Sequence, residues 1–285
     1  MAMLEPVEWS RGSADYPESL EDLDNPPEQL YALGDHDMLR RPIVSIVGTR
    51  NPTSYGLRIT RAIAGALVSA GVSIVSGMAK GIDAAAHRAA LEAGGRTVAV
   101  LGTGIDVPYP AAHRQLHQLL SEKALVVSEN PRGMRAQKGA FPKRNRIIAA
   151  LSPLTIVIEA GEKSGARNTA EHALRLGRNV GAVPGPADSP QSVGCHDLLR
   201  AGCHLIADVQ DATQLLGLSP PPRPRNPVLN QHESAVWGAL ADDGLDVDAL
   251  SARSNLPARE CLAAVTTLEM MGMVECLLTG EVRRR

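Results

Sequence analysis

The chain has 285 residues, of which 44% are apolar and only 2% are aromatic. This length suits one medium domain and a smaller one, both with aliphatic cores. No stretch reaches the ~18 apolar residues of a membrane span, and the N-terminus lacks the basic and apolar regions of a signal peptide. The four cysteines form no CxxC pair, which is typical of reduced thiols, so we expect a cytoplasmic protein.

The net charge of −2 conceals a strong asymmetry along the chain. Residues 1–39 carry one Arg and ten acidic residues, whereas residues 40–150 carry 16 Lys or Arg and five acidic residues. Residues 151–226 are balanced, and residues 227–285 are acidic. A strongly basic block inside a slightly acidic protein indicates an anionic partner, although a basic face spread over solvent would give the same count.

Residues 1–40 form an acidic segment that contains several prolines. We expect turns and a short helix or two that lead into the main domain. The apolar residues of this segment indicate that it docks on that domain: Leu20, Leu23, Leu30, Tyr31 and Leu33.

From residue 43, short β-branched runs alternate with helical patterns. Strands are expected at 43–47, 72–75, 97–101, 124–128, 154–158 and 179–183, and helices at 57–70, 82–94, 111–122, 144–151 and 168–177. Apolar strands that alternate with helices predict a mostly parallel sheet covered on both faces. The fold class is therefore α/β, with an extended Rossmann-like, doubly wound domain over residues 41–218.

A Pro-rich stretch, SPPPRPRNP at 219–227, predicts an extended linker. Residues 228–285 then predict three helices and a short hairpin, the pattern of a winged helix-turn-helix module. The third helix, expected near 257–272, sets Arg259 against Glu260 and Glu269. Reading the major groove needs basic and polar side chains, so this module favours protein contact or structural support over duplex binding.

In doubly wound sheets, ligands bind at the carboxyl ends of the strands. The loops expected there combine glycine with hydroxyl or cationic residues, among them Arg50, Ser76, Gly77, Lys80 and Ser164. Glycine lets backbone N–H groups approach phosphate oxygens, and helix N-termini add partial positive charge. The alternative is that these are only tight turns between strands and helices.

These loops do not match the common nucleotide-binding motifs. The first loop, GTRNPTSYG, lacks GxGxxG, no GxxxxGK[ST] occurs, and the loop after the second strand carries Lys80 in place of an acidic ribose ligand. Binding of NAD or ATP in the standard way is therefore disfavoured, and we expect no cofactor.

Several titratable residues invite a catalytic or metal interpretation. Asp83 and His87 lie four residues apart on an expected helix, which fits an acid–base pair, metal ligands or, as we favour, a local brace of the SGMAKG loop. The Cys-His pairs at 195–196 and 203–204 lack a second half with zinc spacing, so no metal site is expected. His113 and His117 fit a helix face better than a ligand pair.

The segment FPKRNR at 141–146 holds the only Phe of the chain. Residues 132–146 carry six Lys or Arg, including Lys138, and no acid. Phe141 can stack on a base, and its neighbours can meet phosphates, a sugar or a base edge: Lys143, Arg144, Asn145 and Arg146. Cations at a helix start are disfavoured unless an anion lies there. This favours anion binding over the alternative of a core Phe beside solvated cations.

These motifs occur in an order that resembles a known family. IVGTRNPTSYG, SGMAKGIDAAAH, TVAVLGTGIDVPYP, SENPRG, FPKRNRIIAALS, IEAGEKSGARNTA and VPGP run over about residues 43–205. The chain resembles the DNA-processing protein A (DprA, also called Smf) family. The resemblance implies a homodimer that binds single-stranded DNA without catalysis and loads the RecA recombinase during natural transformation, with single-strand-binding protein as a further partner.

The resemblance also implies where the pocket lies. It falls on Arg50, Ser76, Gly77 and the FPKRNR segment, with the SGARNTA loop alongside, including Ser164, Gly165 and Thr169. The chain departs from the family's usual SGS-hydrophobic pattern at Ala166 and Arg167, and Arg167 adds a cation. His113 and His196 stand where Asn is common, and the family's frequent N-terminal helical module has no match in this sequence.

The alternative function is a nucleotide-processing enzyme on the same fold class, such as a phosphoribohydrolase. Glu159 or Asp83 would then act as the acid or base at the strand ends. The PGG-x-GT loop of that enzyme family is absent from the sequence, which counts against this alternative.

Overall fold

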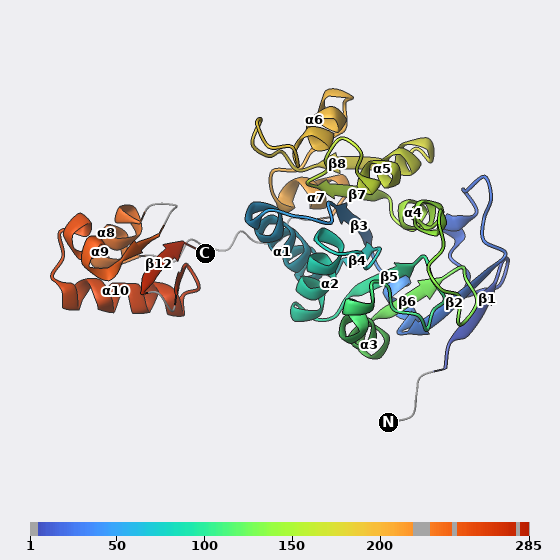
Figure 1. The fold of residues 1–285 in the computed structure, drawn as a ribbon, viewed down its shortest axis with the longest axis horizontal. Coiled ribbons are helices and arrows are strands. Elements are labelled where there is room, and N and C mark those ends of the chain that lie inside the picture. Colours follow the sequence, from blue (N-terminus) through green and yellow to red (C-terminus); the bar gives the residue numbers. More distant parts are fainter. Residues whose placement is uncertain (1–4, 219–228, 241–243, 278–279, 285) are drawn as a thin grey trace. The chain divides into compact units, whose positions relative to one another are not determined.

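The computed structural model describes residues 5–218, 229–240, 244–277 and 280–284. The chain divides into two compact units, Met1–Pro221 and Pro222–Arg285 (Figure 1). The expected linker at 219–227 lies outside the described residues.

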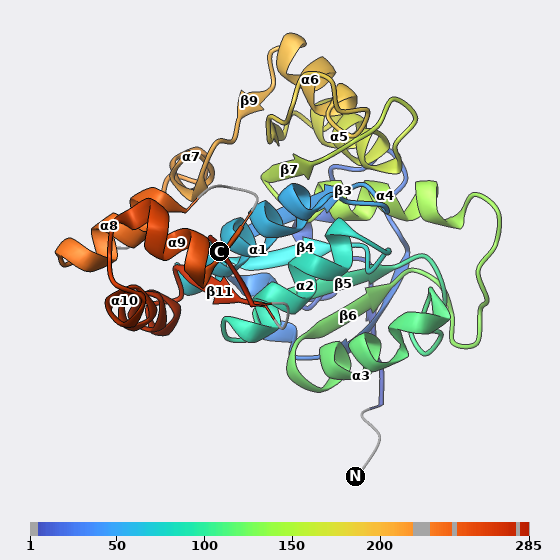
Figure 2. The same cartoon turned by 60° about the vertical axis from the view of Figure 1, so that its left-hand side comes forward.

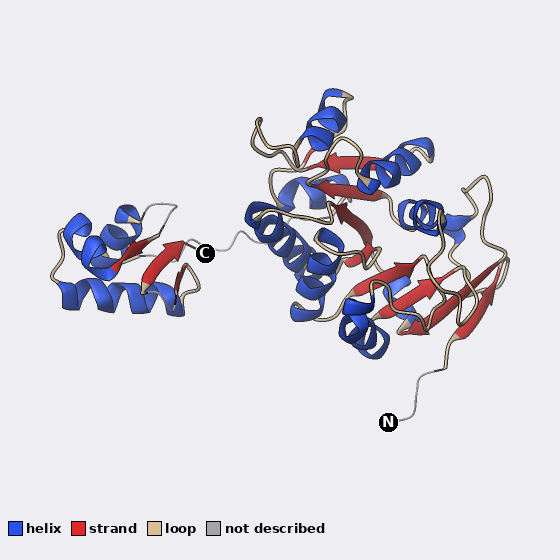
Figure 3. Ribbon diagram, in the orientation of Figure 1, coloured by secondary structure: helices blue, strands red, loops and turns tan. Residues whose placement is uncertain are grey.

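Within residues 5–218, a nine-stranded sheet runs through the first unit (Figure 3). The strand order is β1-β2-β6-β5-β4-β3-β7-β8-β9, and all neighbours from β6 to β9 in this order pair in parallel. The sheet confirms the predicted doubly wound, mostly parallel architecture. Its strands are β1 (Val7–Ser10), β2 (Gln29–Gly34), β3 (Ile43–Gly48), β4 (Ser73–Ser76), β5 (Thr97–Leu101), β6 (Leu125–Ser128), β7 (Leu154–Ile158), β8 (Asn179–Ala182) and β9 (His204–Leu205).

Helices cover both faces of this sheet (Figures 1 and 2). Because side chains alternate along a strand, Ile46 of β3 packs into the core cluster of α1, α2 and α7, while Val47 packs into that of α4, α5 and α6. Helix α3 packs beside α2, on the same face of the sheet as α1 and α7. The helices are α1 (Ser54–Ser69), α2 (Ile82–Glu92), α3 (Arg114–Lys123), α4 (Ala140–Ala150), α5 (Gly165–Arg175), α6 (Val193–Arg200) and α7 (Val209–Leu215), with 3₁₀ turns at Glu18–Leu20, His36–Arg40 and Ala111–His113.

The N-terminal segment differs from the expectation of turns and short helices. It does form two 3₁₀ turns, but β1 and β2 extend the main sheet, and β2 pairs antiparallel with β6. The physical reason is that β2 is apolar on both faces, with Leu30 in one core cluster and Leu33 in another. Docking of the leucines is confirmed, because Leu20, Leu23, Leu30 and Leu33 are all buried.

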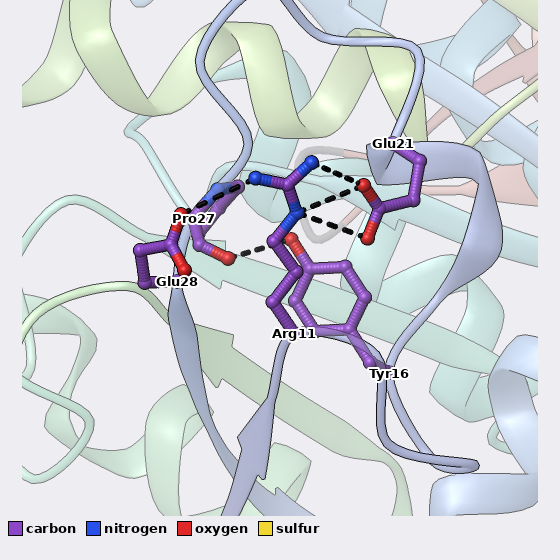
Figure 4. Close-up of polar contacts among 5 residues, drawn as sticks. All are labelled: Arg11, Tyr16, Glu21, Pro27 and Glu28. Atoms are coloured by element: carbon purple, nitrogen blue, oxygen red, sulfur yellow. Dashed lines mark hydrogen bonds and ion pairs between the residues drawn. The ribbon is translucent and has the colours of Figure 1, made fainter.

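A polar cluster closes the long connection between β1 and β2 (Figure 4). Arg11 forms ion pairs with Glu21 at 2.7 Å and Glu28 at 3.3 Å. The hydroxyl of Tyr16 donates to the carbonyl of Pro27 at 2.7 Å. Since the ion pairs are solvent-exposed, they stabilise this segment only weakly, and the buried leucines hold it more strongly.

The second unit has the predicted three helices and hairpin. Its helices are α8 (Gln231–Ala239), α9 (Val247–Ser254) and α10 (Ala258–Met270), and β10 (Leu245–Asp246), β12 (Glu281–Arg284) and β11 (Val274–Cys276) form an antiparallel sheet. The arginines of the hairpin contact their own module: Arg284 lies 4.6 Å from the ring centre of Trp237, and Arg283 pairs with Glu281 at 2.9 Å. None of the helices in the described parts of the chain is long and apolar enough to cross a membrane.

Candidate nucleic-acid interface

The main pocket lies where the winding of the sheet reverses. Strand β3 has β4 on one side and β7 on the other, so the loops after β3 and β7 separate at the carboxyl ends of these strands. A pocket of about 560 Å³ opens there, between these loops and the first turns of α4 and α5. A smaller pocket of about 190 Å³ shares Arg50, Phe141 and Arg144 with it.

The two pockets bring together most of the residues predicted from the sequence. The larger pocket is lined by Arg50, Phe141, Arg144, Asn145, Ser164, Gly165 and Thr169. The smaller pocket adds Gly77 and Lys80. Five predicted residues line neither of these pockets: Ser76, Lys138, Lys143, Arg146 and Arg167.

Gly81 allows the loops after β3 and β4 to touch. Its φ is +80°, and a side chain at this position would overlap the carbonyl oxygen of Thr49. The N–H of Ile82 donates to that same carbonyl at 3.2 Å. This contact brings Arg50 and Lys80 to the mouth of one hollow from two different strands.

Arg144, which was predicted to meet phosphates, lines both pockets but is held mainly by contacts inside the fold. Its side chain is only 4% exposed, and Nη1 donates to the carbonyl of Gly77 at 2.7 Å and to that of Val100. Burial lowers the pKa of Arg144 to about 10, and the nearby Asp83 opposes this shift. The guanidinium is therefore charged at neutral pH and fastens α4 to the loop after β4.

Two predicted hydroxyls are also used inside the fold. Ser76 is fully buried and its hydroxyl donates to the carbonyl of Ile46 at 2.6 Å, between neighbouring strands. Ser164 caps α5, since its hydroxyl oxygen accepts from the N–H of Ala166 at 3.2 Å. The first turn of α5 therefore faces the pocket with its partial positive charge.

Acidic residues from other parts of the chain form ion pairs with three of the cations that were predicted to bind the ligand. Arg146 and Lys143 pair with Glu129 at 2.6 and 3.3 Å. Arg167 pairs with Asp197 at 3.2 Å. The stretch 132–146 contains no acid of its own, so this neutralisation depends on the tertiary fold.

Several exposed cations remain near the pockets or on the loop before α4, where Arg135 is one of them. Among the described residues, no acidic group lies within ion-pair distance of Arg50, Lys80, Lys138 or Lys163, since each recorded pair involves other cations. Three of the four line a pocket, whereas Lys138 does not. The mouth of the site is therefore positively charged, which suits an anionic ligand.

Aromatic rings lie beside these cations. Phe141 and Tyr109 have ring centres 4.8 Å apart and planes 32° apart, and the Cζ of Arg50 lies 6.0 Å from the ring centre of Phe141. Tyr109 was not singled out from the sequence. Its position in the LGTGIDVPYP loop, in a chain with few aromatic residues, is the signal that could have identified it.

An amide pair forms part of the pocket wall. Nδ2 of Asn145 donates to Oδ1 of Asn168 at 3.1 Å and to the carbonyl of Gly165 at 3.3 Å. Asn168 is a second residue that the sequence did not single out, and it follows the SGAR loop on α5. Amides joined in this way hold α4 and α5 at a fixed spacing beside the pocket.

Asp83 braces the loop after β4, as we favoured from the sequence. Its carboxylate accepts from the N–H groups of Gly77 at 3.1 Å and Ala79 at 3.3 Å, and burial raises the pKa of Asp83. His87 instead shares a 2.7 Å hydrogen bond with the hydroxyl of Thr97. The two residues therefore do not form an acid–base pair.

Glu159 is likewise engaged by the backbone. Its carboxylate accepts from the N–H of Thr53 at 2.9 Å and from the hydroxyl of the same residue, and it is only 5% exposed. Thr53 in turn caps α1. Glu159 thus holds the first turn of α1 beside the carboxyl end of β7.

The histidines considered as metal ligands each contact the backbone. His113 hydrogen-bonds with the carbonyl of Met78 at 3.0 Å, His117 with that of Ile105 at 2.8 Å, and His196 with that of Gly185 at 3.0 Å. In the described part of the chain, no three His, Cys, Asp or Glu side chains gather as metal ligands.

The fold and the site define a Rossmann-like α/β protein with a basic, ring-lined crevice at its switch point, joined to a winged-helix module. The chain belongs to the DNA recombination-mediator protein A family, which it matches over residues 9–217. Residues 220–277 match the DprA winged helix domain. The resemblance inferred from the motifs is therefore confirmed.

Individual relatives agree with this assignment. The putative DNA processing protein DprA of Mycobacterium tuberculosis is 40% identical over 260 residues, which cover 88% of this chain and 67% of that protein. The X-ray structure of DprA from Streptococcus pneumoniae, 40% identical, superposes with a TM-score of 0.71 over 74% of each chain. DNA processing protein A from Helicobacter pylori, described for its unique single-stranded DNA binding mode, gives a TM-score of 0.68 at 29% identity over 76% of this chain and 98% of that chain.

Proposed function

We propose that this chain binds single-stranded DNA in the crevice at the carboxyl ends of β3, β4 and β7. The observation that carries the proposal is the grouping of exposed Arg50 and the ring of Phe141 at both pockets with the ring of Tyr109 at the smaller one. Cations attract phosphates with a salt-dependent free energy, and aromatic rings stack on bases of any sequence. The related protein from Helicobacter pylori is described for a single-stranded DNA binding mode, which supports the same ligand class.

The ligand would be held without bond cleavage. A general acid or base must reach the reacting group with a free oxygen, whereas Thr53 donates to both carboxylate oxygens of Glu159, and one oxygen of Asp83 accepts from two backbone N–H groups. One observation favours the alternative, a nucleotide-processing enzyme: Asp83 lines the larger pocket and burial raises its pKa, and such perturbed groups gather at active sites. Because these hydrogen bonds already occupy the carboxylate of Glu159 and one oxygen of Asp83, we prefer a binding role.

In the cell, we propose that the chain acts as a recombination mediator. It would protect single strands and load the RecA recombinase during natural transformation, as a cytoplasmic homodimer that also meets single-strand-binding protein. This role rests on family membership together with the proposed DNA site.

Two assays on the full chain test the proposal together. Fluorescence anisotropy with labelled oligo-dT should show binding that tightens with oligomer length and weakens steeply with salt. Incubation with nucleoside monophosphates should give no hydrolysis. Turnover that disappears in Glu159→Gln or Asp83→Asn would replace this proposal by the enzymatic alternative.

A further inference from the structure

Phe141 is held from several directions, which limits how it can meet a base. Its ring is 4.8 Å from that of Tyr109 between centres and 6.0 Å from the guanidinium carbon of Arg50. Its edge also lies against the backbone of Gly102, where an added Cβ would be 2.9 Å from Cδ1 of Phe141. The ring is half-buried.

Tyr109 is the more exposed ring of the pair. Its side chain is 43% exposed although one side contacts Phe141. Among the described residues, none forms a hydrogen bond with its hydroxyl. An exposed aromatic ring supported from below by a second ring is the arrangement that a base-stacking platform needs.

Tyr109 also lines the smaller pocket, of about 190 Å³. Lys80 lines the same hollow, is exposed and has no acidic partner among the described residues. Both pockets share the wall formed by Arg50 and Phe141. The two hollows are therefore neighbours, each with an aromatic surface and an exposed cation.

We propose that Tyr109, Lys80 and the smaller pocket form a second nucleotide subsite beside the main crevice. Tyr109 stacks on one base of the strand, Lys80 meets a phosphate, and Phe141 holds Tyr109 in position as well as lining the larger pocket. This inference rests on the proposed function, since it assumes that a single strand occupies the crevice. It assigns a role to Tyr109, a ring that lies in the TVAVLGTGIDVPYP motif but was given no function from the sequence.

The test compares two labelled oligomers of equal length, oligo-dT and a fully abasic strand with the same number of phosphates. Loss of one stacked base in Tyr109→Leu should weaken oligo-dT binding about 5- to 150-fold and leave abasic-strand binding unchanged. Tyr109→Phe should bind oligo-dT like the parent protein. Lys80→Ala should weaken both oligomers and reduce the salt slope by about 0.7, whereas Lys123→Ala, an exposed lysine on α3, should change neither.

The outcomes separate this inference from the proposed function. If the parent protein binds no oligo-dT, both are overturned. If the parent binds but Tyr109→Leu weakens both oligomers equally, or neither, only the second subsite is overturned, since a structural role would not depend on the base. A second readout does not depend on whether Tyr109→Leu folds. In Tyr109→Trp, the fluorescence of the new indole should be quenched by oligo-dT and not by the abasic strand. Equal quenching by both strands would also overturn the subsite.

Discussion

The guanidinium of Arg144 donates to the carbonyl of Gly77 at 2.7 Å and joins the helix of the FPKRNR segment to the loop after β4. Both partners were predicted to touch the ligand. Arg144 is almost fully buried, Gly77 leaves just enough space for it, and both residues also line the smaller pocket. The exposed cations and rings of the crevice are thus supported by a buried cation below them.

This contact predicts the effect of adding one methyl group at Gly77. In Gly77→Ala, the new Cβ would lie 2.5 Å from Nη2 of Arg144, so the guanidinium must shift and its hydrogen bonds weaken. A buried group left unpaired costs ~1–3 kcal/mol, so we expect the free energy of unfolding in urea to fall by about that amount, together with weaker oligo-dT binding.

The matched control is Gly65→Ala in helix α1, where an added Cβ meets no atom within 4 Å. Alanine is the better helix former by ~0.5–1 kcal/mol, so this variant should be as stable as the parent or more so. A Gly77→Ala protein with unchanged stability and affinity would show that Arg144 does not hold this loop.

The position of Phe141 predicts a second glycine effect. In Gly102→Ala, the added Cβ would lie 2.9 Å from Cδ1 of Phe141 and displace the ring. Anisotropy titration should then show weaker oligo-dT binding, within the ~1–3 kcal/mol that a lost stacking contact can cost. Gly238→Ala, a helical position with open space around it, serves as the control. Unchanged affinity in Gly102→Ala would argue that the placement of Phe141 does not matter.

Glu159 separates the binding role from the enzymatic alternative. In Glu159→Gln, one acceptor oxygen is replaced by an NH₂ group that cannot accept from the N–H or hydroxyl of Thr53. We expect a loss of about 1–3 kcal/mol in the free energy of unfolding, measured by urea denaturation. At urea concentrations below the unfolding transition, the affinity of Glu159→Gln for oligo-dT should stay within about twofold of that of the parent protein. An affinity loss without any stability loss would place Glu159 in the binding site.

His87 predicts how stability depends on pH. Burial lowers the pKa of His87 to about 3, against an ordinary value of 6.5. Because the folded-state pKa is depressed, the contribution of His87 is fully present above about pH 6.5 and is lost as the pH falls toward 3. Within this window, the free energy of unfolding should fall by ~1.4 kcal/mol per pH unit from this group.

Urea denaturation between neutral pH and about pH 5 measures this effect while most carboxylates stay ionised. Burial also lowers the pKa of His117 and of His172, so both residues contribute to the pH slope of any variant, and only the difference between two proteins reports on His87. The His87→Gln variant should lack this part of the pH slope, although it will be less stable overall because His87 is fully buried. Parallel pH profiles for the two proteins would contradict the assignment.

Much of the fold could be predicted from the sequence because its pattern is local. The β-branched runs at 43–47 and 154–158 are recognisable without context, and they form β3 and β7. Strand β9 could not be found this way, because it has two residues and exists only through pairing with β8. Strand β2 was missed because acidic and proline-containing flanks hide a run whose two faces meet different core clusters.

The candidate site was predictable where backbone geometry alone places a residue at a strand end, as for Arg50 and Lys80. It was not predictable where a side chain or a backbone carbonyl from a distant part of the chain decides the outcome. Glu129 pairs with Arg146 and Lys143, and the carbonyls of Gly77 and Val100 turn Arg144 inward. Such contacts depend on how the chain returns on itself, which a residue pattern does not encode.

The most direct test of the account is the salt dependence of oligo-dT affinity in the parent protein and in Arg50→Ala. Arg50 is exposed at the wall shared by both pockets, so its loss should reduce the slope of log K against log salt by about 0.7. Arg61→Ala, an exposed arginine on α1 away from both pockets, should keep the parent slope. Absence of oligo-dT binding at low salt, or identical slopes in all three proteins, would contradict a single-strand site in this crevice.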